Sequence, residues 1–400
     1  MARRLYLISH RDMRKNRADA VHIMRVCSEY SKNNFDVTLV TPRTLRFEYK
    51  KKLSEIWTIH KVPKTFKVIE LPVFLFDNMP KFFLFYSRFM RFVNYGIYFL
   101  FLLITGKLKK GDVIYISDYT SSLPAILLKK IKLLKCGIFL DKSEIINDGI
   151  RRIVAKNADG IVSINGYIKD TIAKLYSINP EKIFKRPFPS MSEELLVFNE
   201  KDKNYYRELL NIPVEDKIAV YSGKISPDLI EIDMILQAAE ILKDSGIKFY
   251  FIGIREINKQ FYADYLKKRD INNVTFIDFQ PVESFIKYVK IADVLVSYYD
   301  GNDFFSCYLR VPAKSSLYLS SDIPSIFADV HCLREWFTDE MVYFVKPNNP
   351  KLLAEKIKYV IEHPDDARKK AEASLKFAKE SDYSRAYREV CEFINTFNKN

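Results

Sequence analysis

A short segment in the second half of the chain combines residue types that could hold an anionic ligand. It begins Arg310-Val-Pro-Ala-Lys314-Ser315 and continues into an apolar stretch that predicts a helix at residues 312–320. A lysine in the first turn of a helix adds a full positive charge to backbone N–H groups that already favour anions. An apolar run at residues 294–296 predicts a buried strand just before it. We therefore predict a phosphate site at the carboxyl end of a parallel strand.

Each of these residues also has an ordinary interpretation. Most lysines and loop arginines are solvated at the surface, and a serine in a first turn is as often a simple cap. For Lys314 the position at a helix start supplies a mechanism, so we favour ligand binding. Two further cationic candidates follow predicted strands in the same half of the chain: Lys224, directly after Gly223, and Arg255.

Polar residues also follow predicted strands in the first half of the chain. They are His10 and Asp12 after residues 5–8, and Asp118 after residues 113–117. Ligands of parallel sheets bind outside the carboxyl ends of the strands, so these side chains are candidates for a ligand-binding cleft. A histidine at a strand end is nevertheless more often a structural residue. In the second half, Asp303 could supply a carboxylate, although Asp-Gly-Asn-Asp is also ordinary turn chemistry.

The sequence lacks the patterns of several other classes of site. Five scattered cysteines form no C-x-x-C pair, which favours a reducing compartment and argues against zinc or a disulfide framework. The sequence has no D-x-D pair, and its five histidines form no metal-ligand cluster. We therefore expect neither a metal nor a cofactor. The amino-terminal apolar run is too short for a signal peptide, so we expect a cytoplasmic protein.

The positive charge is confined to one half of the chain. Residues 1–190 hold 35 Lys and Arg against 16 Asp and Glu, whereas the remaining residues hold 29 against 34. A basic domain attracts polyanions such as nucleic acid, a phosphate-bearing substrate or an anionic membrane. No nucleic-acid-binding module is recognisable, so we expect no nucleic-acid partner.

Residues 80–110 help to choose among the other polyanions. No charge interrupts residues 92–105, and the flanking cations are Lys81, Arg88, Arg91, Lys107, Lys109 and Lys110. Fourteen helical residues span about 21 Å, which is short of a bilayer. The segment is therefore either a helix buried against the sheet or one lying at a membrane interface. The second interpretation predicts peripheral contact with the inner face of the cell membrane.

Strand and helix patterns alternate along the chain, which predicts parallel sheets covered by helices. The strands are expected at residues 5–8, 37–40, 68–71, 113–116, 137–140, 160–164, 218–221, 249–251, 274–276, 294–296, 325–327 and 342–345. The helices are expected near 18–33, 120–134, 146–157, 167–176, 230–244, 256–268, 282–290, 312–320, 349–362, 365–379 and 383–397. The pattern breaks at residues 185–204. We expect a basic domain at 1–190, a second domain at 191–380, and a final helix at 381–400 that returns to the first domain.

An ordered set of weak motifs resembles a known family. The motifs are residues 16–25 (NRADAVHIMR), 35–40, 219–224 (AVYSGK), 292–300 followed by P-x-K at 312–314, and 345–350 (VKPNNP). Together they resemble retaining glycosyltransferases of the family-four type, which have the GT-B fold. The resemblance implies an α/β protein of two facing Rossmann-like domains with the active site in a cleft between them. It spans nearly the whole chain.

The resemblance also implies a reaction and roles for particular residues. Such enzymes move a sugar from a nucleotide-sugar, without a metal, to a polysaccharide, glycolipid or polyprenyl-phosphate-linked acceptor, as in cell-surface polysaccharide biosynthesis. Gly223, Lys224, Arg255, Arg310, Lys314 and Ser315 would lie on the donor side. His10, Asp118 and Asp303 would be catalytic, and Asp12, Asp141 and Glu144 would lie on the acceptor side.

Several positions depart from the family pattern. Leu309 and Leu317 stand where the family has a pair of acids, and Ile230-Glu231 stands where it has a second basic donor residue. Asp141 and Glu144 fall near the place of a family histidine. Two interpretations therefore stay open. The chain is either a glycosyltransferase that acts on an anionic or lipid-linked acceptor, or a non-catalytic subunit of the same fold that supports a partner glycosyltransferase.

Overall fold

The computed structural model describes residues 2–14, 18–44, 53–73, 81–142, 144–190, 198–310 and 313–397. The chain divides into two compact units. Unit 1 comprises Met1–Pro187 and Ser384–Asn400, and unit 2 comprises Phe188–Tyr383. Pro312 and the Asn16-Arg17 pair of the motifs lie outside the described residues, as do residues 191–197 of the expected boundary.

Unit 1 is built on a seven-stranded parallel sheet with the strand order β3-β2-β1-β4-β5-β6-β7. The strands are β1 (Arg3–Ile8), β2 (Phe35–Thr44), β3 (Lys67–Val73), β4 (Val113–Ile116), β5 (Gly137–Lys142), β6 (Gly160–Ser163) and β7 (Ile183–Lys185). Its helices are α1 (Ala18–Lys32), α2 (Ile56–His60), α3 (Lys81–Ile104), α4 (Tyr119–Lys130), α5 (Gly149–Asn157) and α6 (Gly166–Tyr176), with α16 (Tyr383–Thr396) added from the end of the chain. Short 3₁₀ turns lie at Leu53–Glu55 and Pro180–Lys182.

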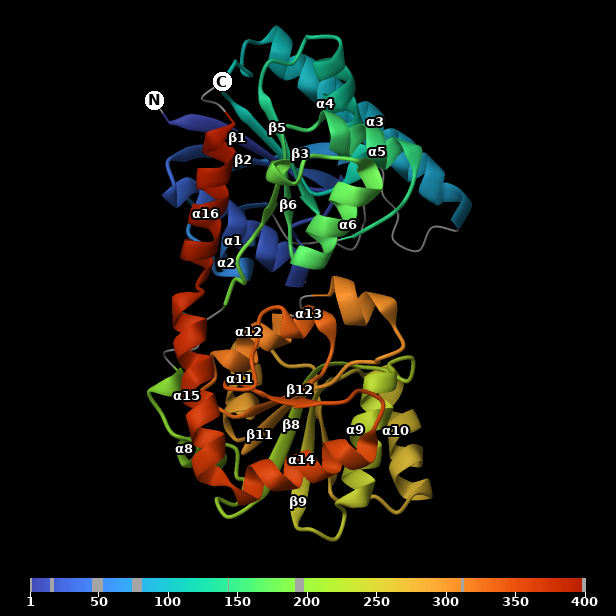
Figure 1. Cartoon of the computed structure of the whole chain (residues 1–400), viewed down its shortest axis with the longest axis vertical. Helices are drawn as coiled ribbons and strands as arrows, with labels where there is room; N and C mark the ends of the chain where they lie inside the picture. Colours follow the sequence, from blue (N-terminus) through green and yellow to red (C-terminus); the bar gives the residue numbers. More distant parts are fainter. Residues whose placement is uncertain are drawn as a thin grey trace. The chain divides into compact units, whose positions relative to one another are not determined.

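Aromatic side chains hold α16 on unit 1. Tyr387 is fully buried, meets the ring of Tyr30 edge-on at 5.7 Å between centroids, and accepts a hydrogen bond from Arg186. Six residues further on, Phe393 stacks on Phe184 of β7 at 5.1 Å between centroids. These contacts explain why α16 belongs to unit 1, although nearly 200 residues separate it from the rest of that unit in the sequence. Figure 1 shows α16 in red beside α1.

Unit 2 is built on a six-stranded parallel sheet with the order β10-β9-β8-β11-β12-β13. The strands are β8 (Lys217–Ile225), β9 (Ile247–Ile254), β10 (Val274–Asp278), β11 (Val294–Ser297), β12 (Ser325–Ala328) and β13 (Tyr343–Val345). The helices are α8 (Lys203–Leu209), α9 (Ile230–Ile241), α10 (Glu256–Lys268), α11 (Val282–Lys290), α12 (Ala313–Leu319), α13 (His331–Arg334), α14 (Pro350–Glu362) and α15 (Pro364–Glu380), with a π-helical turn at Phe305–Leu309. The central strands β11 and β12 are buried along their whole length.

Both sheets reverse their strand order at one point. In unit 1 the reversal lies between β1 and β4, and in unit 2 it lies between β8 and β11. The crossover helices leave a crevice outside the carboxyl ends of the strands at such a point, and ligands of doubly wound sheets bind there. The residues that follow these four strands are therefore the first place to look for a site.

The structure confirms every predicted strand and adds elements that the sequence pattern did not reveal. The additions are α2, β7, α8, α13 and the π-helical turn. Each is at most seven residues long, so it carries too few apolar positions to define a period. Helix α3 is the largest correction, because it has 24 residues and begins eleven residues before the uncharged stretch 92–105. In the part of the chain that the structure describes, no helix meets the length and hydropathy needed to cross a membrane.

Candidate functional site

In unit 1 the sheet reversal brings His10 and Asp118 together. His10 follows β1 and Asp118 follows β4, and their Nδ1 and Oδ2 atoms are 3.9 Å apart. The other carboxylate oxygen of Asp118 accepts the backbone N–H of Ser121 at 3.0 Å, which caps α4 and fixes the carboxylate. Burial lowers the pKa of His10, while Asp118 acts in the opposite direction. The imidazole is therefore neutral near pH 7 and lies beside a positioned carboxylate.

Lys142, at the carboxyl end of β5, lies next to this pair. Its side chain is 1% exposed, and its amine has no hydrogen-bond partner among the described residues. Its Nζ lies 3.2 Å from the ring centroid of Tyr119, and the guanidinium of Arg151 lies 4.8 Å from the same centroid. Burial lowers the pKa of Lys142 to about 7, with Asp118 acting in the opposite direction. Burial without a hydrogen-bond partner disfavours the charged amine, which accounts for the lowered pKa.

The acceptor-side candidates occupy different environments. Asp12 is buried, and one of its oxygens accepts the backbone N–H of Arg14 at 3.0 Å. Arg14 in turn pairs with Glu70 at 2.7 Å, so Asp12 belongs to a structural network. Asp141 is half-buried and accepts a hydrogen bond from Tyr115 at 3.0 Å, and Glu144 is exposed. Of these three candidates, Asp141 and Glu144 lie close enough to Lys142 to influence its charge.

In unit 2 the sheet reversal places Lys314 against two tyrosines. Its amine donates to the hydroxyl of Tyr221 at 3.2 Å and lies 4.3 Å from that ring centroid. The ring of Tyr299, which follows β11, lies 5.3 Å away on another side. Burial lowers the pKa of Lys314 to about 7, with Glu231 acting in the opposite direction. Because α12 has only seven residues, the charge of Lys314 matters more than the helix dipole that the sequence suggested.

Arg310 and Glu231 complete the charged cluster around Lys314. The guanidinium of Arg310 lies 5.2 Å from the ring centroid of Tyr299, and its Nη1 is 3.9 Å from a carboxylate oxygen of Glu231. The side chain of Glu231 is only 8% exposed. The cluster therefore holds two cationic side chains and one buried acid, which partly neutralises them.

Two glycines allow β8 and β9 to approach closely beside this cluster. A Cβ atom on Gly253, which has φ +116°, would lie 2.3 Å from the carbonyl oxygen of Gly223. A Cβ on Gly223, with φ +145°, would lie 3.3 Å from the Tyr221 hydroxyl and 3.9 Å from the Lys314 amine. Neither position accepts another residue without strain. The glycine pair thus connects Lys314 with the end of β9.

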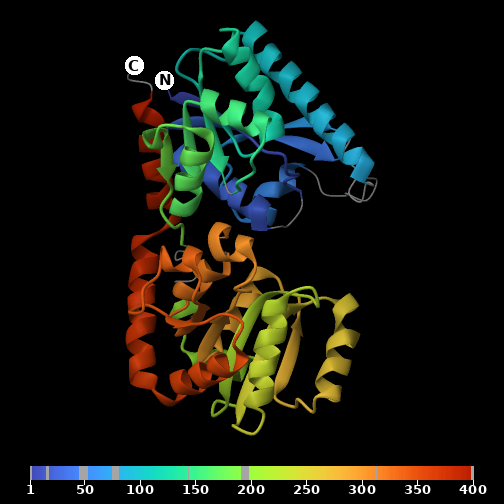
Figure 2. The same cartoon turned by 45° about the vertical axis from the view of Figure 1, so that its right-hand side comes forward.

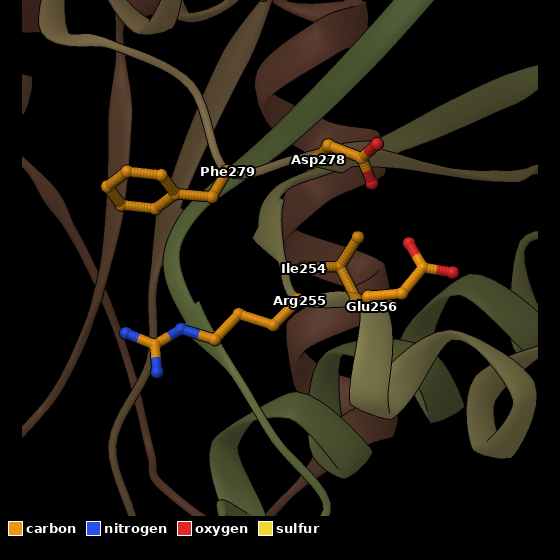
Figure 3. Close-up of a pocket in the computed structure, with 5 residues that line it drawn as sticks. All are labelled: Ile254, Arg255, Glu256, Asp278 and Phe279. Carbon is orange, nitrogen blue, oxygen red and sulfur yellow. The ribbon is translucent and has the colours of Figure 1, made fainter. Parts of the chain in front are cut away.

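A cavity of about 350 Å³ lies at the carboxyl ends of β9 and β10. It is lined by Ile254, Arg255, Glu256, Asp278 and Phe279. Figure 3 shows the guanidinium of Arg255 and the ring of Phe279 extending to the same side, away from Asp278 and Glu256. Phe279 is 68% exposed, so one face of its ring is open beside the cavity. A cation and an open aromatic face suit a planar, polar ligand.

The remaining donor-side candidates and Asp303 lie in less distinctive environments. Ser315 is fully buried, and its hydroxyl lacks a hydrogen-bond partner within the described part of the chain. Lys224 is exposed and pairs with Asp228 at 3.0 Å. Asp303 accepts the backbone N–H and the hydroxyl of Ser306, at 2.9 and 2.6 Å, and these bonds lower its pKa. Asp303 thus stabilises the π-helical turn. The roles predicted for Lys224 and Asp303 stay predictions.

Sequence reasoning missed Lys142, Tyr221, Tyr299 and Phe279, and noted Glu231 only as a departure from a family pattern. The sequence did indicate that Lys142 is buried. Lys142 follows Ile138 and Leu140 at intervals of two residues, so its side chain lies on the same buried face of β5. The tyrosines and Phe279 lie within or just after apolar runs, where an aromatic residue predicts core packing. Among the residues that the structure describes, no group of three or more His, Cys, Asp or Glu is arranged to hold a metal ion.

Comparison with known proteins gives a fold and no sequence family. No protein-family model matches the sequence, and no curated protein sequence does either. Solved structures match over almost the whole chain. A glycosyltransferase from Rickettsia africae is 12% identical with a TM-score of 0.74, covering 100% of this chain and 99% of that one. Sucrose-phosphate synthase from Thermosynechococcus elongatus is 12% identical with a TM-score of 0.73, covering 98% of each chain.

A third similar structure was solved with bound ligands. HepE from Anabaena, in complex with UDP and glucose, is 11% identical with a TM-score of 0.66 and covers 98% of this chain and all of that one. The two parallel sheets, their strand orders and these matches define the GT-B fold. The predicted fold class is therefore confirmed.

Proposed function

We propose that this chain is a glycosyltransferase that moves a sugar from a nucleotide-sugar to a hydroxyl group of an acceptor. The observation that carries the proposal is the cluster of Lys314 and Arg310 at the strand reversal of a GT-B carboxyl-terminal unit, joined through Gly223 and Gly253 to a cavity. Two of the similar structures are named as a glycosyltransferase and a galactosyltransferase, and HepE was solved in complex with UDP-glucose.

Unit 2 would hold the donor. Lys314 and Arg310 provide positive charge for the diphosphate, and the buried hydroxyl of Ser315 provides a donor group. The nucleoside base would lie in the cavity between Arg255 and Phe279, whose volume is at the lower end of the range for small-molecule sites. Transfer without a metal needs this positive field, because negative charge develops on the departing diphosphate.

Unit 1 would activate the acceptor. The bond between the anomeric carbon and the diphosphate oxygen breaks, and the acceptor oxygen forms the new bond to that carbon. The acceptor proton passes to the neutral imidazole of His10, and Asp118 stabilises the imidazolium that results. Lys142 would bind a phosphate or other anionic group of the acceptor, with Asp141 and Glu144 near the same position. A protonated Lys142 favours an acceptor that is anionic, such as a polyprenyl-phosphate-linked sugar, and Asp141 and Glu144 oppose it.

The stereochemistry of transfer is a separate question with a direct test. The sequence resemblance implies retention of the anomeric configuration, whereas a base positioned for the acceptor hydroxyl is what a single inverting displacement requires. Nuclear magnetic resonance of the product distinguishes the two anomers.

The second candidate function is that of a non-catalytic subunit beside an active glycosyltransferase. Leu309 and Leu317 favour it, because both are only 6% exposed and neither can bind sugar or ribose hydroxyls as the family acids do. Glu231 also favours it, since a buried acid weakens the field that Lys314 and Arg310 present to a diphosphate.

A panel of nucleotide-sugars tests the two candidates. Release of nucleoside diphosphate is measured with each donor, in the presence and absence of membranes that supply an acceptor. The transferase proposal expects release with one donor and an increase when membranes are added. Inactivity with the whole panel, together with stable binding to another glycosyltransferase, would decide for the subunit.

A further inference from the structure

Helix α3 carries large apolar side chains on two opposite faces. The buried face consists of Tyr95, Tyr98, Phe99 and Leu102, which are at most 7% exposed. The open face consists of Tyr86, Phe89, Ile97, Leu100, Phe101 and Ile104, which are 41–85% exposed. Both sets follow the spacing of three and four residues that aligns side chains along a helix, and they are offset by two residues. Packing within unit 1 explains the first face and leaves the second uncovered.

The open face of α3 is long enough to lie along a surface. From Tyr86 to Ile104 it extends over about 27 Å of helix. Figure 2 shows α3 on the outer side of unit 1, with its full length visible. Isolated apolar side chains are normal at a surface, but a continuous stripe of this length marks an interaction site.

A cationic border lies at one end of this stripe. The segment after α3 and the segment after α4 enter the neighbouring strands β4 and β5, and the N–H of Gly137 donates to the carbonyl of Asp112 at 2.9 Å. Both segments therefore lie at the amino-terminal edge of the sheet. Their exposed cations are Lys107, Lys109, Lys110, Lys130, Lys132 and Lys135. Exposed apolar residues accompany them in the second segment at Ile131 and Leu133.

Acidic residues are almost absent from this region. Residues 81–136 contain ten Lys and Arg but only two acids, Asp112 and Asp118. Asp112 pairs with Arg4 at 2.8 Å, and Asp118 caps α4. Both carboxylates are thus committed within unit 1. We name the open face of α3 together with the six lysines the α3/α4 surface.

We propose that unit 1 docks on an anionic lipid membrane through the α3/α4 surface. An amphipathic helix at an interface buries its apolar face at the level of the acyl chains, while lysines remain among the anionic headgroups. Lys107 places a cation beside an apolar side chain in this way, because its amine lies 5.4 Å from the ring centroid of Phe101. A second copy of the chain is a poorer occupant, because a two-fold interface would bring the same lysines against each other.

Vesicle binding tests this proposal with the full-length chain. Co-sedimentation is measured with vesicles of phosphatidylcholine alone and with vesicles containing one-third phosphatidylglycerol. The Ile97→Glu/Ile104→Glu and Lys109→Glu/Lys110→Glu variants are expected to lose at least tenfold in affinity for the anionic vesicles. These side chains are exposed, so the substitutions leave the fold intact.

Matched controls lie on α10 in unit 2. Ile257 is 86% exposed, compared with 85% for Ile104, and Lys267 and Lys268 are also exposed. Ile257→Glu and Lys267→Glu/Lys268→Glu should bind vesicles as the wild type does. The proposal is overturned if the wild type ignores anionic vesicles or if the controls lose as much affinity as the α3 variants. A dimer that dissociates in the Ile104→Glu variant, without vesicle binding, would assign the surface to a second copy instead. The surface lies wholly on unit 1, so the outcome is independent of any transferase activity.

Discussion

The carboxyl edges of the two sheets present similar lysines in different electrostatic settings. Burial lowers the pKa of both Lys142 in unit 1 and Lys314 in unit 2 to about 7. Lys314 donates a hydrogen bond to Tyr221 and has the buried acid Glu231 nearby. Lys142 makes no hydrogen bond within the described residues and lies against the ring of Tyr119.

The different surroundings of Lys142 and Lys314 indicate which of the two positions depends more on a bound anion. The cluster around Lys314 already contains a compensating carboxylate, so it is stable when empty and binds an added anion with a weaker net field. Lys142 also has acids nearby, since Asp118, Asp141 and Glu144 all raise its pKa, but its amine donates no hydrogen bond within the described residues. We infer that the amine of Lys142, which lacks a hydrogen bond, destabilises the empty protein more than the amine of Lys314 does.

The first prediction separates the two units by function. His10→Ala should lower the rate of sugar transfer by about 10²–10⁴-fold, the usual contribution of a general base. The affinity for the nucleoside diphosphate should stay unchanged, because His10 belongs to unit 1. Transfer rates and calorimetric titration of the nucleotide check the two parts. An equal loss in both measurements would contradict the division of roles.

The second prediction concerns the charge balance in unit 2. Lys314→Ala should weaken nucleoside diphosphate binding at least tenfold, about 1.4 kcal/mol. Glu231→Gln should act in the opposite direction, because it removes the negative charge that opposes the diphosphate. Lys243→Ala is the control, since Lys243 pairs with Asp270 after α9, at the other edge of the sheet. Dissociation constants that are the same for Lys314→Ala and wild type would remove Lys314 from the site.

The third prediction concerns stability in unit 1. Lys142→Met keeps the buried aliphatic stem and removes the amine, so we expect the free energy of unfolding to rise by about 1 kcal/mol. The same variant should lose transfer activity, as expected of a residue retained for a ligand. Chemical denaturation measures the first effect. A clear loss of stability would show that the amine supports the fold.

The pH dependence of Lys142 gives the same experiment a second readout. Its pKa is about 7 in the folded chain and about 10.5 in the unfolded chain. Between these values the unfolded state binds more protons, so this group makes the wild type more stable as the pH rises from 7 towards 10.5. Below pH 7 both states are protonated and the penalty is constant. The advantage of Lys142→Met should therefore have its full value below pH 7 and decline as the pH rises towards 10.5.

Much of the fold could be predicted from local patterns. Runs such as Val113–Ile116 and Val294–Ser297 are continuous, apolar and rich in β-branched residues, and each proved to be a fully buried strand. Elements without such a run escaped prediction. Strand β7 has only three residues, and α8 falls in a polar stretch where composition predicts a linker.

The candidate site was only partly predictable. Lys314 and Arg310 are close in sequence, so a local motif could suggest that they act together. Glu231 lies about 80 residues from them, and no sequence spacing indicates that it approaches Arg310 to 3.9 Å. Likewise, only the parallel pairing of β4 with β5 brings Tyr119, at the start of α4, against Lys142 at the end of β5.

The alternation of strands and helices, the basic first half and the candidate cationic residues could all be read from the sequence, because they depend on local periodicity and composition. Only the tertiary structure decided which lysines are buried, which acids compensate them and which face of α3 stays uncovered. The physical reason is that desolvation and charge pairing depend on every element packed around a group. The sequence gives the chemical type of each side chain, whereas the residues packed around that side chain determine its protonation state and its partners.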